Sequence, residues 1–309
     1  MWLILAFVSA AFLGFYDTSK KASLKNNAVL PVLLLNTVFS TVIFSPFLLD
    51  YSLGTAWFSG TVFDTEPCAD GGHVPALRAH GLVLLKSIIV LSSWIFGYFG
   101  LKHLPLTLVG PINATRPVLV LVGATLLFGE RLNVYQWAGI LTTILSIYMM
   151  SRAGKKEDID FKSNKWIWCV AAATTMGAVS GLYDKFVMRE LRPMFVQSWF
   201  NFYQMLIMIV VCAVLRYFKR HDTTPFKWRW AIPLISVFIC IADFAYLSSL
   251  SNPDSMISVV SLVRRSSVII SFLCAAIIFK ERNLRTKAFD LVLILVGMAL
   301  IWIGTNNVS

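Results

Sequence analysis

The sequence predicts an all-α membrane protein, with ten transmembrane helices arranged as two inverted five-helix repeats. Hydrophobic residues make up 57% of the 309 residues and charged residues only 14%, and the mean hydropathy is +0.72. A soluble domain needs about a quarter charged residues, so lipid is predicted to be the main solvent of this chain. The apolar runs are about twenty residues long, which is the span of a bilayer as a helix. They lack the alternation of barrel strands, and only helices otherwise satisfy their backbone inside lipid.

From the amino terminus onward, each predicted span is an apolar run, and charged residues gather in the short patches between runs. The first run lacks a basic leading region and a small-residue cleavage site, so we expect a retained helix instead of a signal peptide. The ten predicted helices cover residues 1–19, 28–49, 80–101, 105–128, 133–151, 166–187, 193–215, 229–250, 254–279 and 286–304. Two connections are long: the polar loop 50–79 and the charged linker 152–165. The linker separates a first five-helix repeat, 1–151, from a second, 166–309.

Three short motifs occur twice, in the same order in each half of the sequence, and indicate an internal repeat. The first is Ala10-x-x-x-Gly14-Phe-Tyr16-Asp17 against Gly177-x-x-x-Gly181-Leu-Tyr183-Asp184. The second pairs Tyr98 and Pro105 with Tyr246 and Pro253, each proline being followed eleven residues later by an arginine, Arg116 or Arg264. The third pairs Phe128-Gly-Glu130-Arg131 with Phe279-Lys-Glu281-Arg282. Five spans per half is an odd number, so the second half enters the membrane in the opposite sense, as in many transporters. The competing interpretation is a duplication without transport.

Basic residues predict the orientation. The loops after the odd-numbered spans hold 18 of the 27 Lys and Arg residues. Cytoplasmic loops carry such an excess, so both termini and loop 50–79 are predicted to lie outside the cell's inner (plasma) membrane. The net charge of +11 is explained in the same way, and no nucleic-acid partner is expected. Five scattered cysteines form no CxxC or Cys/His cluster, so neither a disulfide framework nor a metal site is indicated.

Residues 117–150 (PVLVLVGATLLFGERLNVYQWAGILTTILSIYMM) and 267–304 each hold a Glu-Arg turn followed by a Gly-bearing final helix. They resemble the end of an EamA-type repeat of the drug/metabolite transporter superfamily. The opening residues 10–23 (AAFLGFYDTSKKAS) resemble the first helix of that repeat, with an altered aromatic-Gly signature. The resemblance implies two EamA-like repeats around a central cavity in a ten-helix transporter. It implies cytoplasmic termini too, against the basic-residue bias, and loop 50–79 is longer than the pattern.

Ionisable residues inside predicted spans mark the candidate site. Each costs about 2.5–3.5 kcal/mol on insertion scales, so such side chains usually face a cavity or a partner. Arg116, Arg264 and Arg265 lie near one depth, and guanidinium groups grip carboxylate or phosphate oxygens in a bidentate manner. We therefore expect an anionic or zwitterionic substrate between the fourth and ninth helices. The alternative is internal pairing with Asp17, Asp184 or Asp243.

Further candidates surround this arginine cluster. Asp243 lies deep in its span, where it either pairs with an arginine or takes up protons. Asp17 and Asp184 are candidate coupling or counter-ion groups. The alternative interpretation is that they are carboxylates at helix ends, near the membrane interface. Lys86 is expected to snorkel to the interface. Tyr98, Tyr246 and Asn113 are candidate substrate-binding residues, although tyrosine also anchors helices at interfaces and asparagine bonds neighbouring helices.

No catalytic constellation competes with a binding site. No HExxH or GxSxG pattern lies within a span, so neither an enzyme nor a cofactor is predicted. The predicted function is a secondary transporter for a small polar metabolite, with the substrate and the lipid bilayer as partners. Proton coupling and a homodimer are left open by the sequence. The alternative function is a non-transporting scaffold or sensor that uses loop 50–79 for recognition.

Overall fold

The regular structure of this chain is helical. The computed structural model describes residues 2–68, 74–120, 133–155, 163–217, 224–252, 260, 263–280 and 284–306. These ranges contain no strand. Their helices are α1 (Trp2–Leu24), α2 (Val29–Leu53), α3 (Ala76–His103), α4 (Leu106–Ala114), α6 (Val134–Lys155), α7 (Lys165–Glu190), α8 (Pro193–Tyr217), α9 (Ala231–Leu250), α11 (Ser267–Ile278) and α12 (Leu284–Asn306).

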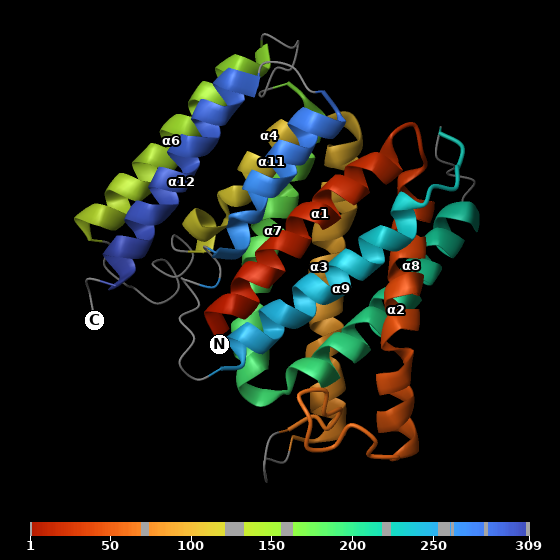
Figure 1. Cartoon of the computed structure of the whole chain (residues 1–309). Coiled ribbons are helices and arrows are strands. Elements are labelled where there is room, and N and C mark those ends of the chain that lie inside the picture. Colours follow the sequence, from red (N-terminus) through yellow and green to blue (C-terminus); the bar gives the residue numbers. More distant parts are fainter. Residues whose placement is uncertain are drawn as a thin grey trace.

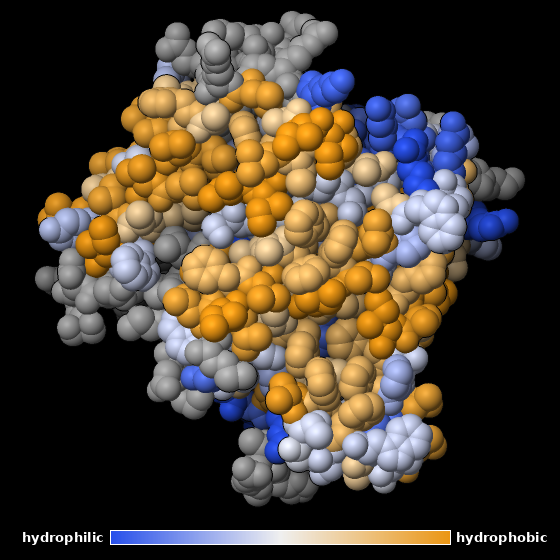
Figure 2. Space-filling view, viewed as in Figure 1, coloured by the Kyte–Doolittle hydropathy of each residue, from blue (hydrophilic) through white to orange (hydrophobic). Residues whose placement is uncertain are grey.

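Six of these helices, α1, α2, α3, α7, α8 and α9, are long and apolar enough to cross a membrane. Figure 2 shows apolar side chains over the face that α1, α9 and α12 form, with hydrophilic side chains gathered toward its ends. Apolar surface of this extent is stable only against lipid or a partner. The prediction of a helical multi-pass membrane protein is confirmed at this level.

Helices from the two halves of the chain pack against each other in pairs. α1 lies along α9 and α3 lies along α7, while α2 packs on α8, α4 on α11 and α6 on α12 (Figure 1). The α6–α12 pair stands to one side of the other helices. Glycine brings these two helices close, because a Cβ on Gly139 would lie 2.6 Å from the Gly297 carbonyl oxygen. Gly14 of α1 similarly meets Ile270 of α11, as the small-residue motif predicts.

The two helices that carry the candidate arginines are interrupted beside them. The predicted helix 105–128 stops as α4 at Ala114, turns at Thr115 and resumes over 116–120, and its remainder lies outside the described residues. Pro117 has no N–H to donate to a preceding carbonyl group and disfavours helical geometry in the residue before it, which accounts for the interruption. In the predicted helix 254–279, residues 263–265 are helical, Ser266 turns, and α11 follows. The Ser266 hydroxyl donates to the Val263 carbonyl oxygen at 2.6 Å, a local bond that competes with the helix.

The loop after α2 is folded back onto the protein. It is shorter than the predicted loop 50–79, because α2 continues to Leu53 and α3 begins at Ala76. The Asp50 carboxylate accepts hydrogen bonds at 2.7 Å from the Thr55 and Thr65 hydroxyls and from the Trp57 backbone N–H. These bonds fix the loop to the end of α2.

The same loop also contacts the second half of the chain. Asp64 forms an ion pair with Arg192, which precedes α8, and the Phe63 ring stacks on Phe244 of α9 with centroids 5.5 Å apart. Burial alone would raise the pKa of Asp64. The backbone N–H groups of Glu66 and Gly60 and the Arg192 guanidinium together hold that pKa below its ordinary value. The loop therefore connects the halves at one end of the helices.

Candidate functional site

A charged cavity of about 130 Å³ lies between the two halves of the chain. Side chains of α1, α3, α4, α7, α8, α9 and α11 line it, together with residues beside the two helix interruptions. Five cationic and three anionic side chains are among them. They are Lys20, Lys86, Arg116, Arg264 and Arg265, and Asp17, Asp184 and Asp243. The described part of the cavity wall thus carries more positive than negative groups.

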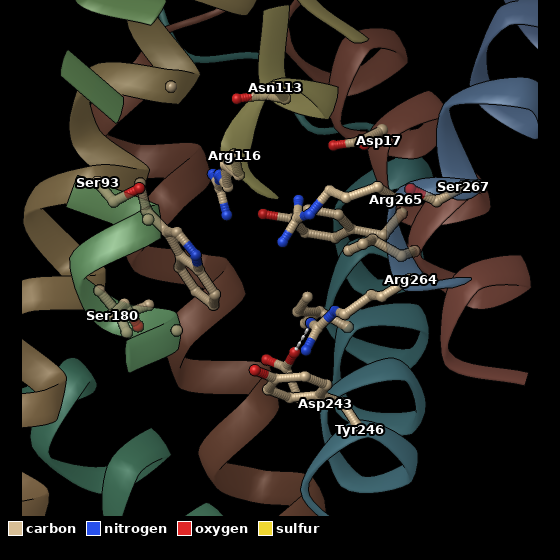
Figure 3. Close-up of a pocket in the computed structure, with 18 of the residues that line it drawn as sticks. Asp17, Ser93, Asn113, Arg116, Ser180, Asp243, Tyr246, Arg264, Arg265 and Ser267 are labelled. Carbon is tan, nitrogen blue, oxygen red and sulfur yellow. Dashed lines mark hydrogen bonds and ion pairs between the residues drawn. The ribbon is translucent and has the colours of Figure 1, made fainter. Parts of the chain in front are cut away.

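Arg264 is held by two residues of α9. Its guanidinium forms an ion pair with the Asp243 carboxylate, and its central carbon lies 4.0 Å from the centroid of the Tyr246 ring (Figure 3). Only 10% of the Arg264 side chain and 16% of the Asp243 side chain are exposed. The low dielectric strengthens the attraction within this pair and offsets part of the cost of burying both charges. Arg264 is therefore both neutralised and oriented.

Arg116 has no such partner. The structure gives it no carboxylate within 4.0 Å among the described residues, and its buried Nε has no hydrogen-bond acceptor there. Its guanidinium lies against α7 at Gly177, where a Cβ would overlap it. Gly177 therefore makes room for a charged group, whereas Gly14, the repeat equivalent of Gly181, serves helix packing.

Arg265 approaches from the second half of the chain. Within the described part of the structure it too forms no ion pair with a carboxylate. Figure 3 shows Arg116 and Arg265 pointing into the same space, with Asp17 and Asn113 near one edge and the Arg264–Asp243 pair near the other. The structure thus brings the three predicted arginines to one cavity from two sides.

Asp17 and Lys20 form a looser pair on α1. The Lys20 Nζ lies 3.8 Å from an Asp17 oxygen and also stands over the Tyr16 and Tyr98 rings, 4.8 and 4.6 Å from their centroids. Tyr98 is fully buried and is not among the residues lining the cavity, although Tyr246, its repeat equivalent, is. The carboxylate of Asp17 lies in the cavity wall and not at a solvated helix end.

Lys86 and Asp184 form a third pair, from α3 to α7. Both side chains are buried, 6% and 8% exposed, and the Lys86 Nζ lies 4.9 Å from the centroid of the Phe200 ring. The expectation that Lys86 snorkels is wrong, because the carboxylate of Asp184 offers a buried partner. Sequence reasoning noted both charges, but the pairing depends on which helices touch.

Polar side chains complete the wall. Asn113 of α4 lines the cavity, and its side-chain oxygen accepts a hydrogen bond from the Thr174 hydroxyl at 3.0 Å. It therefore links two helices and keeps its amide N–H₂ as a donor. Gln197 of α8 was missed by sequence reasoning; it lines the cavity with a buried side-chain oxygen that has no donor among the described residues. Nothing in its local sequence separates it from the other amides of that helix.

Several sequence expectations fall outside the described residues. They are the proline Pro253 and the Glu-Arg turns with Glu130, Arg131, Glu281 and Arg282.

The fold and the cavity define a helical multi-pass membrane protein with a charged chamber between its halves. The chain belongs to the EamA-like transporter family, whose model matches residues 1–152 and 164–303. It is therefore a membrane transporter of small molecules by family, as the resemblance of its repeat ends predicts. No curated protein matches the chain. A solved structure titled only "Crystal structure of protein" is similar over 100% of this chain and 99% of its own, with 18% identity and a TM-score of 0.61. That likeness concerns the fold alone.

Proposed function

We propose that this protein is a secondary transporter that moves a small anionic or zwitterionic metabolite by alternating access. The cavity between the halves carries the proposal, because three arginines from two sides of the molecule reach it. Guanidinium groups in a low-dielectric chamber bind carboxylate or phosphate oxygens strongly. A closed, apolar centre would instead favour the scaffold or sensor alternative, and the loop proposed for recognition is bound to its own chain.

An inverted repeat is the second part of the proposal. Repeat equivalence pairs α1 with α7 and α3 with α9. Exchanging the two halves therefore turns the contact of α1 with α9 into the contact of α7 with α3, and both contacts are present. Two halves related by a pseudo-two-fold axis in the membrane plane are expected to make such matching contacts. Rocking of one half against the other would expose the cavity to each side in turn.

Distinct roles follow for the charged groups. Arg116 and Arg265 bind the substrate, and Arg264, oriented by Asp243 and Tyr246, completes the cationic wall. The amide N–H₂ of Asn113 donates a hydrogen bond to the substrate. Asp17 and Asp184 are the candidate coupling carboxylates, since each already shares its charge with a lysine and can change partner when a substrate or proton arrives.

Counterflow in proteoliposomes tests the function. Purified protein is reconstituted with internal anions, zwitterions or cations of metabolite size, and uptake of the labelled solute is measured. We expect uptake of an anionic or zwitterionic solute, and loss of that uptake with Arg265→Ala, which breaks no ion pair among the described residues. Transport of cations alone, or wild-type transport by Arg265→Ala, would contradict the site.

The orientation is tested separately. We propose external termini, because Lys21, Lys25, Lys102, Lys227 and Arg229 lie at the helix ends opposite the α2–α3 loop. Cys68 of that loop should then react with an impermeant thiol reagent in intact cells. Labelling that occurs only after lysis would place the termini in the cytoplasm.

A further inference from the structure

We infer that the transported solute is a compact dianion. This inference rests on the proposed function and adds the charge and the size of the substrate to it. Three observations support it. They are the ion pairs within the cavity, the orientation of the two guanidiniums outside those pairs, and the volume of the cavity.

The charge of the cavity wall is unbalanced by two units among the residues that the structure describes. Five cationic side chains of this described wall face three carboxylates, and each carboxylate has a cationic neighbour within 4.0 Å. The pairs are Lys20–Asp17, Lys86–Asp184 and Arg264–Asp243. Arg116 and Arg265 are the two cations of the described wall that remain. A monoanion or a zwitterion would leave at least one guanidinium without a counter-charge.

The two remaining guanidiniums face one region of space. Arg116 extends from the first half and Arg265 from the second, and in Figure 3 their ends approach each other across the cavity. Two like charges in a chamber of low dielectric repel each other, and each has lost much of its hydration. One solute with two negative charges relieves both costs. It would also connect the halves, because its charges are shared between an arginine of each.

The volume sets the second limit. A cavity of about 130 Å³ is slightly smaller than an engineered protein cavity of about 150 Å³ that admits benzene. A three- or four-carbon dicarboxylate or phosphate monoester is of this order. A nucleotide is far larger and would need the helices to separate. The volume of the cavity therefore favours a small dicarboxylate or phosphate monoester over a nucleotide.

Binding by the purified protein in detergent tests the charge. The probes are succinate and a three-carbon phosphate monoester as dianions, lactate as a monoanion and alanine as a zwitterion, all measured by calorimetry and thermal shift. We expect at least one dianion to bind at least tenfold more tightly than lactate and alanine. For the phosphate monoester, whose second pKa is about 6, affinity should rise between pH 5 and pH 8 as the second charge appears.

Matched variants decide whether the two arginines cause the preference. Arg116→Gln and Arg265→Gln should each lower dianion affinity at least tenfold and reduce the preference over lactate. Arg78→Gln is the control, because this substitution also removes one positive charge. The Arg78 side chain is 58% exposed and is paired with Glu190, and it does not line the cavity. It should bind like the wild type.

Three results would overturn the inference. They are lactate or alanine bound as tightly as the dianions, no binding of any dianion, and a dianion preference that survives Arg116→Gln. The same probes are then used in counterflow. Dianion binding without transport of any solute would contradict the proposed function and leave the charge assignment standing. Transport of alanine or lactate without dianion binding would contradict the charge assignment and leave the proposed function standing.

Discussion

The two halves of the chain carry equivalent arginines in different electrostatic surroundings. Arg264 of the second half pairs with Asp243 and lies on Tyr246, whereas no described carboxylate contacts Arg116 of the first half. Aligning Tyr98 with Tyr246 explains the difference, because Ile95 then stands where the second half has Asp243. The first half therefore contributes a cation without a contacting carboxylate to the described cavity wall, whereas its equivalent in the second half is paired with a residue of α9.

The largest expected effect concerns the paired arginine. Arg264→Gln leaves the Asp243 carboxylate buried without its partner, and breaking a buried pair in this way costs about 3–5 kcal/mol. Asp243→Asn should be similarly destabilising, since it leaves Arg264 beside two other guanidiniums. The double variant should recover most of the loss. Thermal unfolding in detergent measures all three, and a double variant as unstable as the worse single one would show that the pair is not coupled.

Arg116→Gln should act on stability in the opposite direction. Removal of an unpaired buried guanidinium relieves desolvation and repulsion, so the substrate-free protein should unfold at a higher temperature than the wild type. Transport should nevertheless fall by about 10- to 100-fold, because hydrogen bonds to a charged group contribute about 1.5–3 kcal/mol. A lower unfolding temperature together with unchanged transport would place Arg116 in the structural framework and remove the contrast between the halves.

A smaller effect is expected at the glycine against which Arg116 lies. In Gly177→Ala the new Cβ overlaps the guanidinium and displaces it, so transport should fall about five- to tenfold. Gly81→Ala makes the same change on α3, at an exposed position that does not line the cavity and where a Cβ meets nothing within 4 Å. Both variants gain similar helix propensity, about 1 kcal/mol, so their difference isolates the contact with Arg116. Equal transport by the two would show that the position of Arg116 is not set by Gly177.

Sequence patterns identified the helices and the three arginines because both leave local signals. A twenty-residue apolar run and a charge inside it are visible without knowledge of the neighbours. The interruptions at Thr115 and Ser266 were missed, although Pro117 supplied a signal for the first one. The ion pairs could not be predicted from the sequence. Whether Lys86 snorkels or meets Asp184 depends on the contact of α3 with α7. The burial of Tyr98 behind Lys20 likewise depends on how α1 and α3 meet.

The loop after α2 ties the first half to the second through the ion pair of Asp64 with Arg192. The folded pKa of Asp64 lies below its unfolded value of about 3.9, so the pair contributes stability above that pH. The contribution is lost as the pH falls below about 4 and through the folded pKa. The protection factors of the amides of residues 54–68, which correct each exchange rate for its intrinsic pH dependence, should therefore fall in this range. Asp64→Asn should give low protection factors at every pH. Because a partly exposed pair contributes little, about 0.2–1 kcal/mol, the change should be confined to the loop. Accelerated exchange in α8 and α9 as well would mean that this contact holds the halves together, and that their asymmetry extends beyond the cavity.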